Sequence, residues 1–236
     1  MEVAQVISLS PVRHRDDVLA GEGLLPVMPA LRELLPGGGL QRGSVVTSGT
    51  FGLLTLALVA EAVSGGAWCA IAGVPAVGLR AGAEAGLDLS RVLLVAEPGP
   101  GWPRVVASLL DGFDLVVLRP PGQPPAQLRR RLEAAARRHG SVLVIAGDWP
   151  GAQARLLVAD AEWTGISAGH GRLQARRAQV VAAGRGAGER PRSAWLWLPG
   201  PDGTVTVAAG GAGETATGGG ARDGFAVAAR SLASSG

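Results

Sequence analysis

Lysine, asparagine and tyrosine are all absent from this chain of 236 residues, so its 22 basic side chains of the Lys and Arg class are all arginine. Without lysine, the protein has no Schiff-base lysine, no lysine general base and no phosphate-binding lysine. Without asparagine, it has no site for N-glycosylation. A GC-rich genome also favours arginine over lysine, so we take the missing lysine as a limit on chemistry and not as a sign of function.

Cysteine and charge are scarce as well. Cys69 is the one cysteine, so no internal disulfide can form, and the sequence holds no Cys/His cluster that predicts a zinc site. The place of Cys69 inside an apolar run predicts a small core side chain. Charged residues make up 17% of the chain and the net charge is +3, which permits contact with nucleic acid without requiring it.

Long apolar runs are missing too. The longest one, residues 53–60, is far too short to cross a bilayer. The first 17 residues lack the charged start and apolar stretch of a signal peptide, so we expect a cytoplasmic protein without a membrane partner. The content of hydrophobic residues, 47%, is enough to build a substantial core.

Short apolar runs alternate with helical patterns in the first two thirds of the chain. Strands are expected at residues 43–48, 68–72, 91–95, 114–118 and 141–146, and helices at residues 53–63, 79–85, 103–110 and 125–139. Continuous apolar strands separated by helices predict an α/β fold, with a mostly parallel sheet flanked by helices on both faces.

The pattern changes after residue 146. Apolar runs at residues 155–158, 178–181, 194–198 and 204–207 follow one another without helical patterns, which predicts an antiparallel β extension at the C-terminal side. A Gly-rich linker and a short tail with Phe225 and Leu232 end the chain. We therefore expect an N-terminal segment (1–30), a core domain (31–207) and a linker with a C-terminal tail (208–236).

In a parallel α/β protein, the turn after an early strand is the usual phosphate site. A P-loop has four residues between its glycines, followed by Lys and Ser or Thr. Here only two residues separate Gly49 from Gly52, and Leu53 and Leu54 come next. Thr55 is one place late and is expected to face its own helix backbone. We expect no catalytic residue, no cofactor and no metal at this degenerate loop, and no nucleotide hydrolysis.

Several segments, in order, resemble the nucleotide-binding core of the RecA family: LPGGGLQRGSVV (35–46), GAWCAIAGVPAVGLRAGAEAGLDLSRVLLVAEPG (66–99), DLVVLRPP (114–121) and SVLVIAGDW (141–149). The likeness covers about residues 30–200 and implies a RecA-like sheet. It places Val74 where the family has its catalytic glutamate, and Arg119 where it has the Walker B aspartate. The resemblance therefore implies a RecA-like pseudo-ATPase.

Within that group, the LWLPGPDG ending, the GHGRL segment and the Gly-rich tail resemble the ImuA′-type accessory proteins of the actinobacterial mutasome. This resemblance implies a non-catalytic scaffold in DNA-damage-induced (SOS) translesion synthesis. The implied partner is an inactive Y-family polymerase homologue of the ImuB type. Through that partner, the resemblance implies an error-prone C-family polymerase and the sliding clamp, with recruitment to the nucleoid.

Arginines gather in two places, the helix at 125–139 and the stretch at 172–192. The first cluster is ordinarily explained as a solvated helix face. His170 in GHGRL lies where RecA-like proteins carry a DNA-binding loop, but its ordinary explanation is a residue in a turn. We take as candidate contacts to a partner, or weakly to DNA, these residues: Arg129, Arg130, Arg137, Arg138, Arg172, Arg176, Arg177, Phe225 and Leu232.

Three alternatives stay open at this point. A cell-division inhibitor resembling SulA would be shorter and would not need the arginine-rich stretch at 172–192. An active NTPase with an unorthodox loop would lose hydrolysis when Gly49 or Gly52 is changed. A DNA-binding modulator of RecA filaments would have a DNA affinity that falls steeply with salt.

Overall fold

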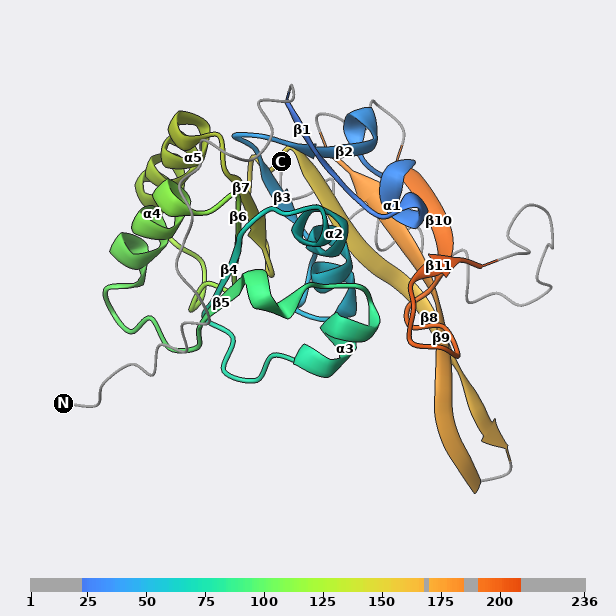
Figure 1. Cartoon of the computed structure of the whole chain (residues 1–236). Helices are drawn as coiled ribbons and strands as arrows, with labels where there is room; N and C mark the ends of the chain where they lie inside the picture. The colour runs from blue at the N-terminus through green and yellow to red at the C-terminus, as the bar shows by residue number, and fades with distance from the viewer. Residues whose placement is uncertain (1–22, 168–169, 185–190, 209–236) are drawn as a thin grey trace.

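The computed structural model describes residues 23–167, 170–184 and 191–208. Across these residues a nine-stranded sheet has the order β11-β10-β9-β8-β3-β7-β6-β4-β5, and a small second sheet pairs β1 with β2 (Figure 1). The strands from β3 to β8 pair in parallel, and β8 to β11 pair antiparallel. The mixed α/β fold with a mostly parallel sheet and antiparallel strands at its C-terminal end is therefore confirmed.

The strands of the parallel part are β3 (Val45–Thr47), β4 (Cys69–Ala72), β5 (Val92–Val95), β6 (Leu115–Leu118) and β7 (Val142–Ile145). The helices are α1 (Pro29–Arg32), α2 (Leu53–Ser64), α3 (Leu79–Glu84), α4 (Trp102–Gly112) and α5 (Ala126–His139), with 3-10 turns η2 (Pro36–Gly38) and η3 (Leu89–Arg91). Each strand and helix expected between residues 43 and 146 is present, with bounds that agree to within about two residues. No helix of the described residues is long and apolar enough to cross a membrane.

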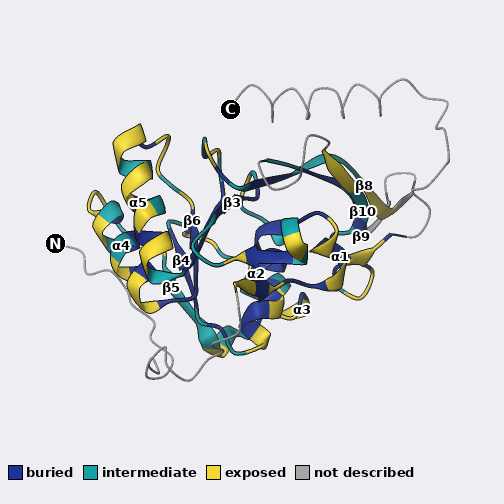
Figure 2. Ribbon diagram, turned by 90° about the horizontal axis from the view of Figure 1, so that it is seen from above, coloured by how far each residue is buried: buried dark blue, intermediate teal, exposed yellow. Residues whose placement is uncertain are grey.

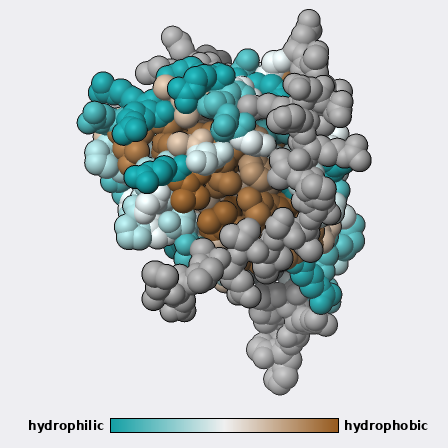
Figure 3. Space-filling view, turned by 60° about the vertical axis from the view of Figure 1, so that its left-hand side comes forward, coloured by the Kyte–Doolittle hydropathy of each residue, from teal (hydrophilic) through white to brown (hydrophobic). Residues whose placement is uncertain are grey.

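The central parallel strands β3, β4, β6 and β7 are buried on both faces, whereas β5 at the edge is half-buried. Successive side chains of a strand point to opposite sides of the sheet. Val46, Ile71 and Val144 pack against the side covered by α1, α2 and α3. Val45 and Leu143 pack against the side covered by α4 and α5. Figure 2 shows the two helical layers on either side of the sheet, with buried residues turned inward. Figure 3 turns the side of the molecule with α4 and α5 forward, where apolar side chains gather among hydrophilic ones.

Several short elements precede the part that the sequence pattern predicts. β1 (Leu24–Pro26) pairs antiparallel with β2 (Gly39–Gln41), and α1 follows β1 directly. Their apolar side chains, among them Leu25 and Leu31, are buried in the same core as α2. A strand of three residues ending in proline gives no periodic signal, so the pattern did not predict it.

The β extension is longer than expected and not wholly antiparallel. β8 (Ala154–Ser167) and β9 (His170–Ala183) have 14 residues each, against the four-residue runs at 155–158 and 178–181. β8 first pairs in parallel with β3 and then antiparallel with β9. The hairpin projects beyond the body (Figure 1), and β10 (Arg192–Trp197) and β11 (Thr206–Val207) complete the edge. His170 is the first residue of β9 and pairs with Ser167, so it lies where the hairpin turns.

Cys69 is fully buried in β4, which confirms its role as a core side chain. Burial, with a smaller contribution from the charge of Asp114, raises the pKa of the Cys69 thiol to about 12. The thiol is therefore protonated at neutral pH, and it has neither the exposure nor the low pKa that a nucleophilic cysteine needs.

A nearly buried carboxylate ties the amino ends of the strands together. Asp114, directly before β6, accepts a hydrogen bond from Nη1 of Arg42 at 2.9 Å, and its other oxygen accepts one from the backbone N–H of Trp68 at 3.1 Å. Arg42 also donates to the carbonyl of Gly140 at 3.3 Å. One carboxylate thus connects the residues that lead into β3, β4 and β6.

Replacing Asp114 by alanine should lower the free energy of unfolding by about 3 kcal/mol, because it leaves the guanidinium of Arg42 without its buried partner. Urea unfolding of the purified chain measures the change. Asp202→Ala is the matched control, because Asp202 is exposed and its carboxylate accepts hydrogen bonds from Thr204 within its own turn. Equal losses in the two variants would show that the Asp114 ion pair does not hold the strand ends.

Candidate functional site

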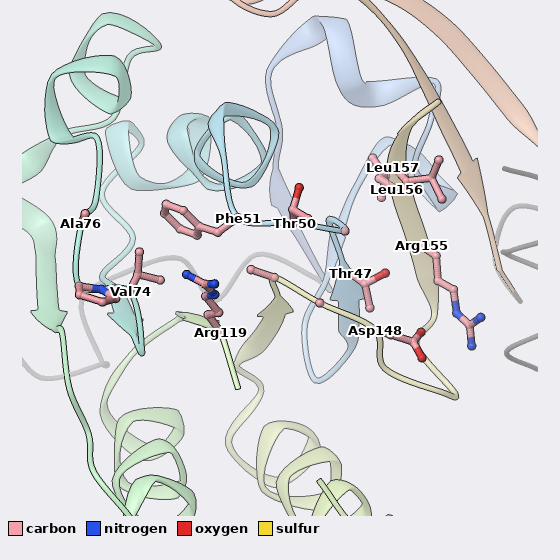
Figure 4. Close-up of a pocket in the computed structure, with 14 residues that line it drawn as sticks. Thr47, Thr50, Phe51, Val74, Ala76, Arg119, Asp148, Arg155, Leu156 and Leu157 are labelled. Carbon is pink, nitrogen blue, oxygen red and sulfur yellow. The ribbon is translucent and has the colours of Figure 1, made fainter. Parts of the chain in front are cut away.

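The carboxyl ends of β3, β4, β6 and β7 meet at one edge of the sheet, next to the part of β8 that runs on beyond β3. A cavity of about 740 Å³ lies there (Figure 4). It is lined by Thr47, Gly49, Thr50, Phe51, Val74, Pro75, Ala76, Arg119, Ala146, Gly147, Asp148, Arg155, Leu156 and Leu157. In open α/β sheets, ligands bind at this edge, outside the carboxyl ends of the strands.

The loop between β3 and α2 closes on itself through hydroxyl groups. The side chains of Ser48 and Thr55 share a hydrogen bond of 2.8 Å, and Thr55 also accepts one from the backbone N–H of Gly52 at 3.3 Å. Thr55 therefore contacts its own helix backbone, as expected, but it also holds the start of the loop. Gly49 makes the turn with a φ of +67°, a left-handed conformation that favours glycine.

The two leucines that stand where a P-loop has Lys and Ser or Thr turn away from the cavity. Leu54 is buried in the core, and Leu53 packs against the same core. Neither side chain lines the cavity, and neither does Gly52. The degenerate loop thus contributes to the cavity its backbone, the hydroxyl group of Thr50 and the ring of Phe51, but no lysine.

Val74 and Arg119 also line this cavity. They occupy the two positions where the resemblance expects acidic residues. Val74 follows β4 and is almost fully buried in the core. Arg119 follows β6, and its guanidinium points into the cavity beside Phe51 (Figure 4). Within the described ranges no acidic side chain pairs with this guanidinium.

The backbone under Arg119 is held by the neighbouring strand ends. The N–H of Arg119 donates to the carbonyl of Ala72 at 3.0 Å, and the N–H of Gly73 donates to that of Val95 at 3.0 Å. Gly73 has a φ of +75°, and a Cβ at this position would lie 2.3 Å from the carbonyl oxygen of Arg119. The close approach therefore requires glycine and fixes where the Arg119 side chain begins.

The charges around the cavity are mixed. Asp148 is exposed and accepts a hydrogen bond from the amide of Gln123 at 3.1 Å. Arg155 is buried at the start of β8 and is already engaged in the fold. In the part of the chain that the structure describes, no cluster of three or more His, Cys, Asp or Glu could hold a metal ion. The lining can thus bind an anion or an apolar group, and it offers one carboxylate.

Four of the arginines chosen from the sequence lie on α5. Nη1 of Arg129 donates to the carbonyl of Pro124 at 2.8 Å, whereas Arg130, Arg137 and Arg138 are exposed. They lie far from the β8–β9 hairpin, because α5 and the hairpin are at opposite sides of the molecule in Figures 1 and 2. The candidate arginines therefore do not form one surface.

The hairpin arginines stack on tryptophans. The guanidinium of Arg176 lies 5.8 Å from the ring centre of Trp163, and that of Arg177 lies 4.6 Å from the ring centre of Trp195. Of Arg172 the structure describes only the backbone, in β9. Phe225 and Leu232 lie outside the described residues.

Sequence reasoning did not select Phe51, Arg155 or Leu157, which line the cavity. Phe51 lies between the two glycines of the degenerate loop, and the P-loop pattern specifies no side chain at that position. Arg155 and Leu157 belong to β8, which pairs with β3 only in the three-dimensional fold. Their position after or beside strand ends is the one signal that points to them.

The fold and the cavity define a mixed α/β protein with a strand-end site from which the P-loop side chains are missing. A family model described as the MT3502 N-terminal domain matches residues 33–151, which contain Gly49, Val74 and Arg119. The Mycobacterium tuberculosis (strain ATCC 25618 / H37Rv) protein Rv3395c is 36% identical over 186 residues, which cover 70% of this chain and 91% of the relative. The chain belongs to the family of the MT3502 N-terminal domain.

Replacing Gly73 by alanine should lower the free energy of unfolding by about 3 kcal/mol, because a left-handed φ and a backbone clash act together. Gly99→Ala is the matched control, since Gly99 has a φ of +65° but nothing within 4 Å of the added Cβ. It should cost about 1 kcal/mol, the conformational part alone. Urea unfolding measures both variants, and equal losses would show that the contact with Arg119 is not tight.

Proposed function

We propose that this protein is a non-catalytic RecA-like scaffold of the ImuA′ type, which acts in DNA-damage-induced translesion synthesis. The observation that carries the proposal is the cavity at the strand ends. Val74 and Arg119 line it at the two positions that the resemblance assigns to the catalytic glutamate and the Walker B aspartate.

The chemistry of these residues argues against phosphoryl transfer. Catalysis of this reaction depends on positioned charges, with a magnesium ion held by a hydroxyl and a carboxylate, and a residue that orients the nucleophile. Val74 cannot orient or deprotonate a nucleophile. Arg119 places a permanent cation where a metal-binding carboxylate is needed, and a cation repels magnesium. Ser48 and Thr55 use their hydroxyl groups for each other.

The proposed partner is the inactive Y-family polymerase homologue of the ImuB type, and through it the error-prone C-family polymerase and the sliding clamp. Two observations support a binding role. The sheet and its helices are complete although the loop has lost its chemistry, so the fold still presents a rigid surface. The mycobacterial source of the relative agrees with an accessory protein of an actinobacterial system. The proposed place of action is the cytoplasm, at the nucleoid when the complex is recruited.

A binding comparison tests this function. The purified chain should retain the ImuB-like homologue in a pull-down without nucleotide, and added Mg-ATP should leave the retained amount unchanged. Calorimetric titration with Mg-ATP should give no magnesium-dependent binding, because the cavity supplies a cation in place of metal ligands.

Gly52→Ala is the diagnostic variant, since nothing lies within 4 Å of the added Cβ and Gly52 has extended backbone. The variant should fold and bind the homologue like the unchanged chain. Magnesium-dependent ATP hydrolysis that Gly52→Ala abolishes would show an active NTPase and contradict the scaffold. Failure to retain the homologue would contradict the proposed partner.

A second candidate function, direct contact with single-stranded DNA, is favoured by one observation on the β8–β9 hairpin. Trp163 is 51% exposed although it is a large aromatic side chain, and it lies opposite Arg176 in the register of the two strands. An exposed indole beside a guanidinium suits stacking on a base together with contact to a phosphate.

If the hairpin binds DNA, Trp163→Ala should weaken binding of a fluorescent oligothymidine by about tenfold, the effect of losing one base stack. Trp163→Phe keeps an aromatic face and is the matched control, which should retain most of the affinity. Anisotropy measured at several salt concentrations should also show the steep salt dependence of phosphate contacts. Equal affinity of all three proteins would exclude the hairpin as the DNA site.

A further inference from the structure

The cavity at the strand ends continues past Arg119 into a second cavity of about 640 Å³. The two cavities share Arg119 and Pro75. The second one reaches from the end of β5 to the start of α4, where Trp102 lies. The strand-end groove, as we call the two cavities together, therefore crosses the carboxyl ends of the parallel strands with Arg119 in its middle.

The walls of the strand-end groove are largely apolar on both sides of Arg119. Phe51 and Val74 stand on one side. On the other side are Trp102, which is 9% exposed, and a set of prolines: Pro98, Pro100, Pro120 and Pro121. Proline has a fixed φ and no N–H, so these segments form stiff walls with few backbone donors. Such walls suit apolar side chains or an extended, proline-containing segment.

The charged side chains of the groove favour a ligand that carries a single negative charge. Arg119 lies in the middle, without an acidic partner in the described part of the chain. Glu97 lines one half and Asp148 the other, and both are exposed. Arg155 also lines the half with Asp148, but it is buried and already engaged in the fold. A ligand with one carboxylate at its centre is attracted by Arg119 and keeps away from the two acids. A polyphosphate carries several charges over the same length and meets their repulsion.

We propose that the strand-end groove binds an extended segment of a partner protein, in which a single Asp or Glu pairs with Arg119 and apolar residues on both sides fill the two cavities. An arginine fork accepts a carboxylate through two parallel hydrogen bonds, which gives both affinity and register. Gly73 and the ends of β4 and β6 hold the Arg119 backbone, so binding costs conformational entropy of the Arg119 side chain but little of its backbone. The inference rests on the proposed function in that it takes the ligand to be a protein partner.

The test uses two blocked pentapeptides with acetylated N-termini and amidated C-termini, Pro-Leu-Glu-Leu-Pro and Pro-Leu-Gln-Leu-Pro. Binding to the full chain is followed by NMR, through the indole N–H of Trp102 and the side-chain N–H of Arg119. The Glu peptide should bind about tenfold more tightly than the Gln peptide, the effect of one charged hydrogen-bonding pair. Arg119→Gln should abolish this difference, whereas Arg130→Gln, on the exposed face of α5, should keep it.

Three results would overturn the inference: equal binding of the two peptides, binding of neither, or a difference that survives in Arg119→Gln. Inorganic triphosphate that binds through Arg119 more tightly than the Glu peptide would overturn it in favour of a phosphate ligand. A thermal melt of Arg119→Gln that matches the unchanged chain shows that the fold is intact.

The pull-down separates this inference from the proposed function. If Arg119→Gln retains the ImuB-like homologue as well as the unchanged chain does, the groove is not its docking site, and the scaffold function stands while the inference fails. If the homologue does not bind at all but the two peptides are still distinguished through Arg119, the scaffold function fails and the groove remains a site for an acidic segment.

Discussion

Burial of the central parallel strands on both faces is the constraint on which the rest of this structure depends. A strand with no solvent-facing side must pair its N–H and C=O groups within the sheet, so β4, β6 and β7 run in register and end together. The cavity at their carboxyl ends is a consequence of this alignment. Residues that follow the strands, such as Val74 and Arg119, line the cavity with side chains that the backbone pairing of the strands does not need. Their chemistry can therefore change while the frame persists.

The sequence predicted the parallel part of the fold well, because strands such as β6 are continuous apolar runs and α5 has an apolar stripe opposite its arginines. The sequence pattern underestimated the length of the β8–β9 hairpin, because Asp160, Glu162 and Gly165 interrupt the apolar pattern and suggest a loop. In the structure the two strands support each other through their register, despite two irregularities. Pairing between β8 and β9, which the local pattern does not show, therefore determines how long the two strands are.

The candidate site divides in the same way. The comparison with the P-loop pattern pointed to Gly49, the resemblance pointed to Val74 and Arg119, and the fold brings these three to one cavity. Spacing alone could not show that Leu53 and Leu54 turn into the core, although this explains why leucine is tolerated there. The arginines of α5 and the hairpin look alike in the sequence but lie on opposite sides, so composition did not reveal that they are separate surfaces.

Arg119 gives the cavity a positive charge, in a chain that has no lysine. A P-loop protein neutralises phosphate with a lysine and a metal ion. Here an arginine whose backbone is held beside Gly73 places a positive charge at the strand ends, on an exposed side chain. Its charge does not depend on pH, and its planar fork prefers a carboxylate or phosphate held at a set angle. A permanent cation at the strand ends, where the resemblance expects a metal-binding carboxylate, therefore favours an acidic ligand over a metal-bound nucleotide.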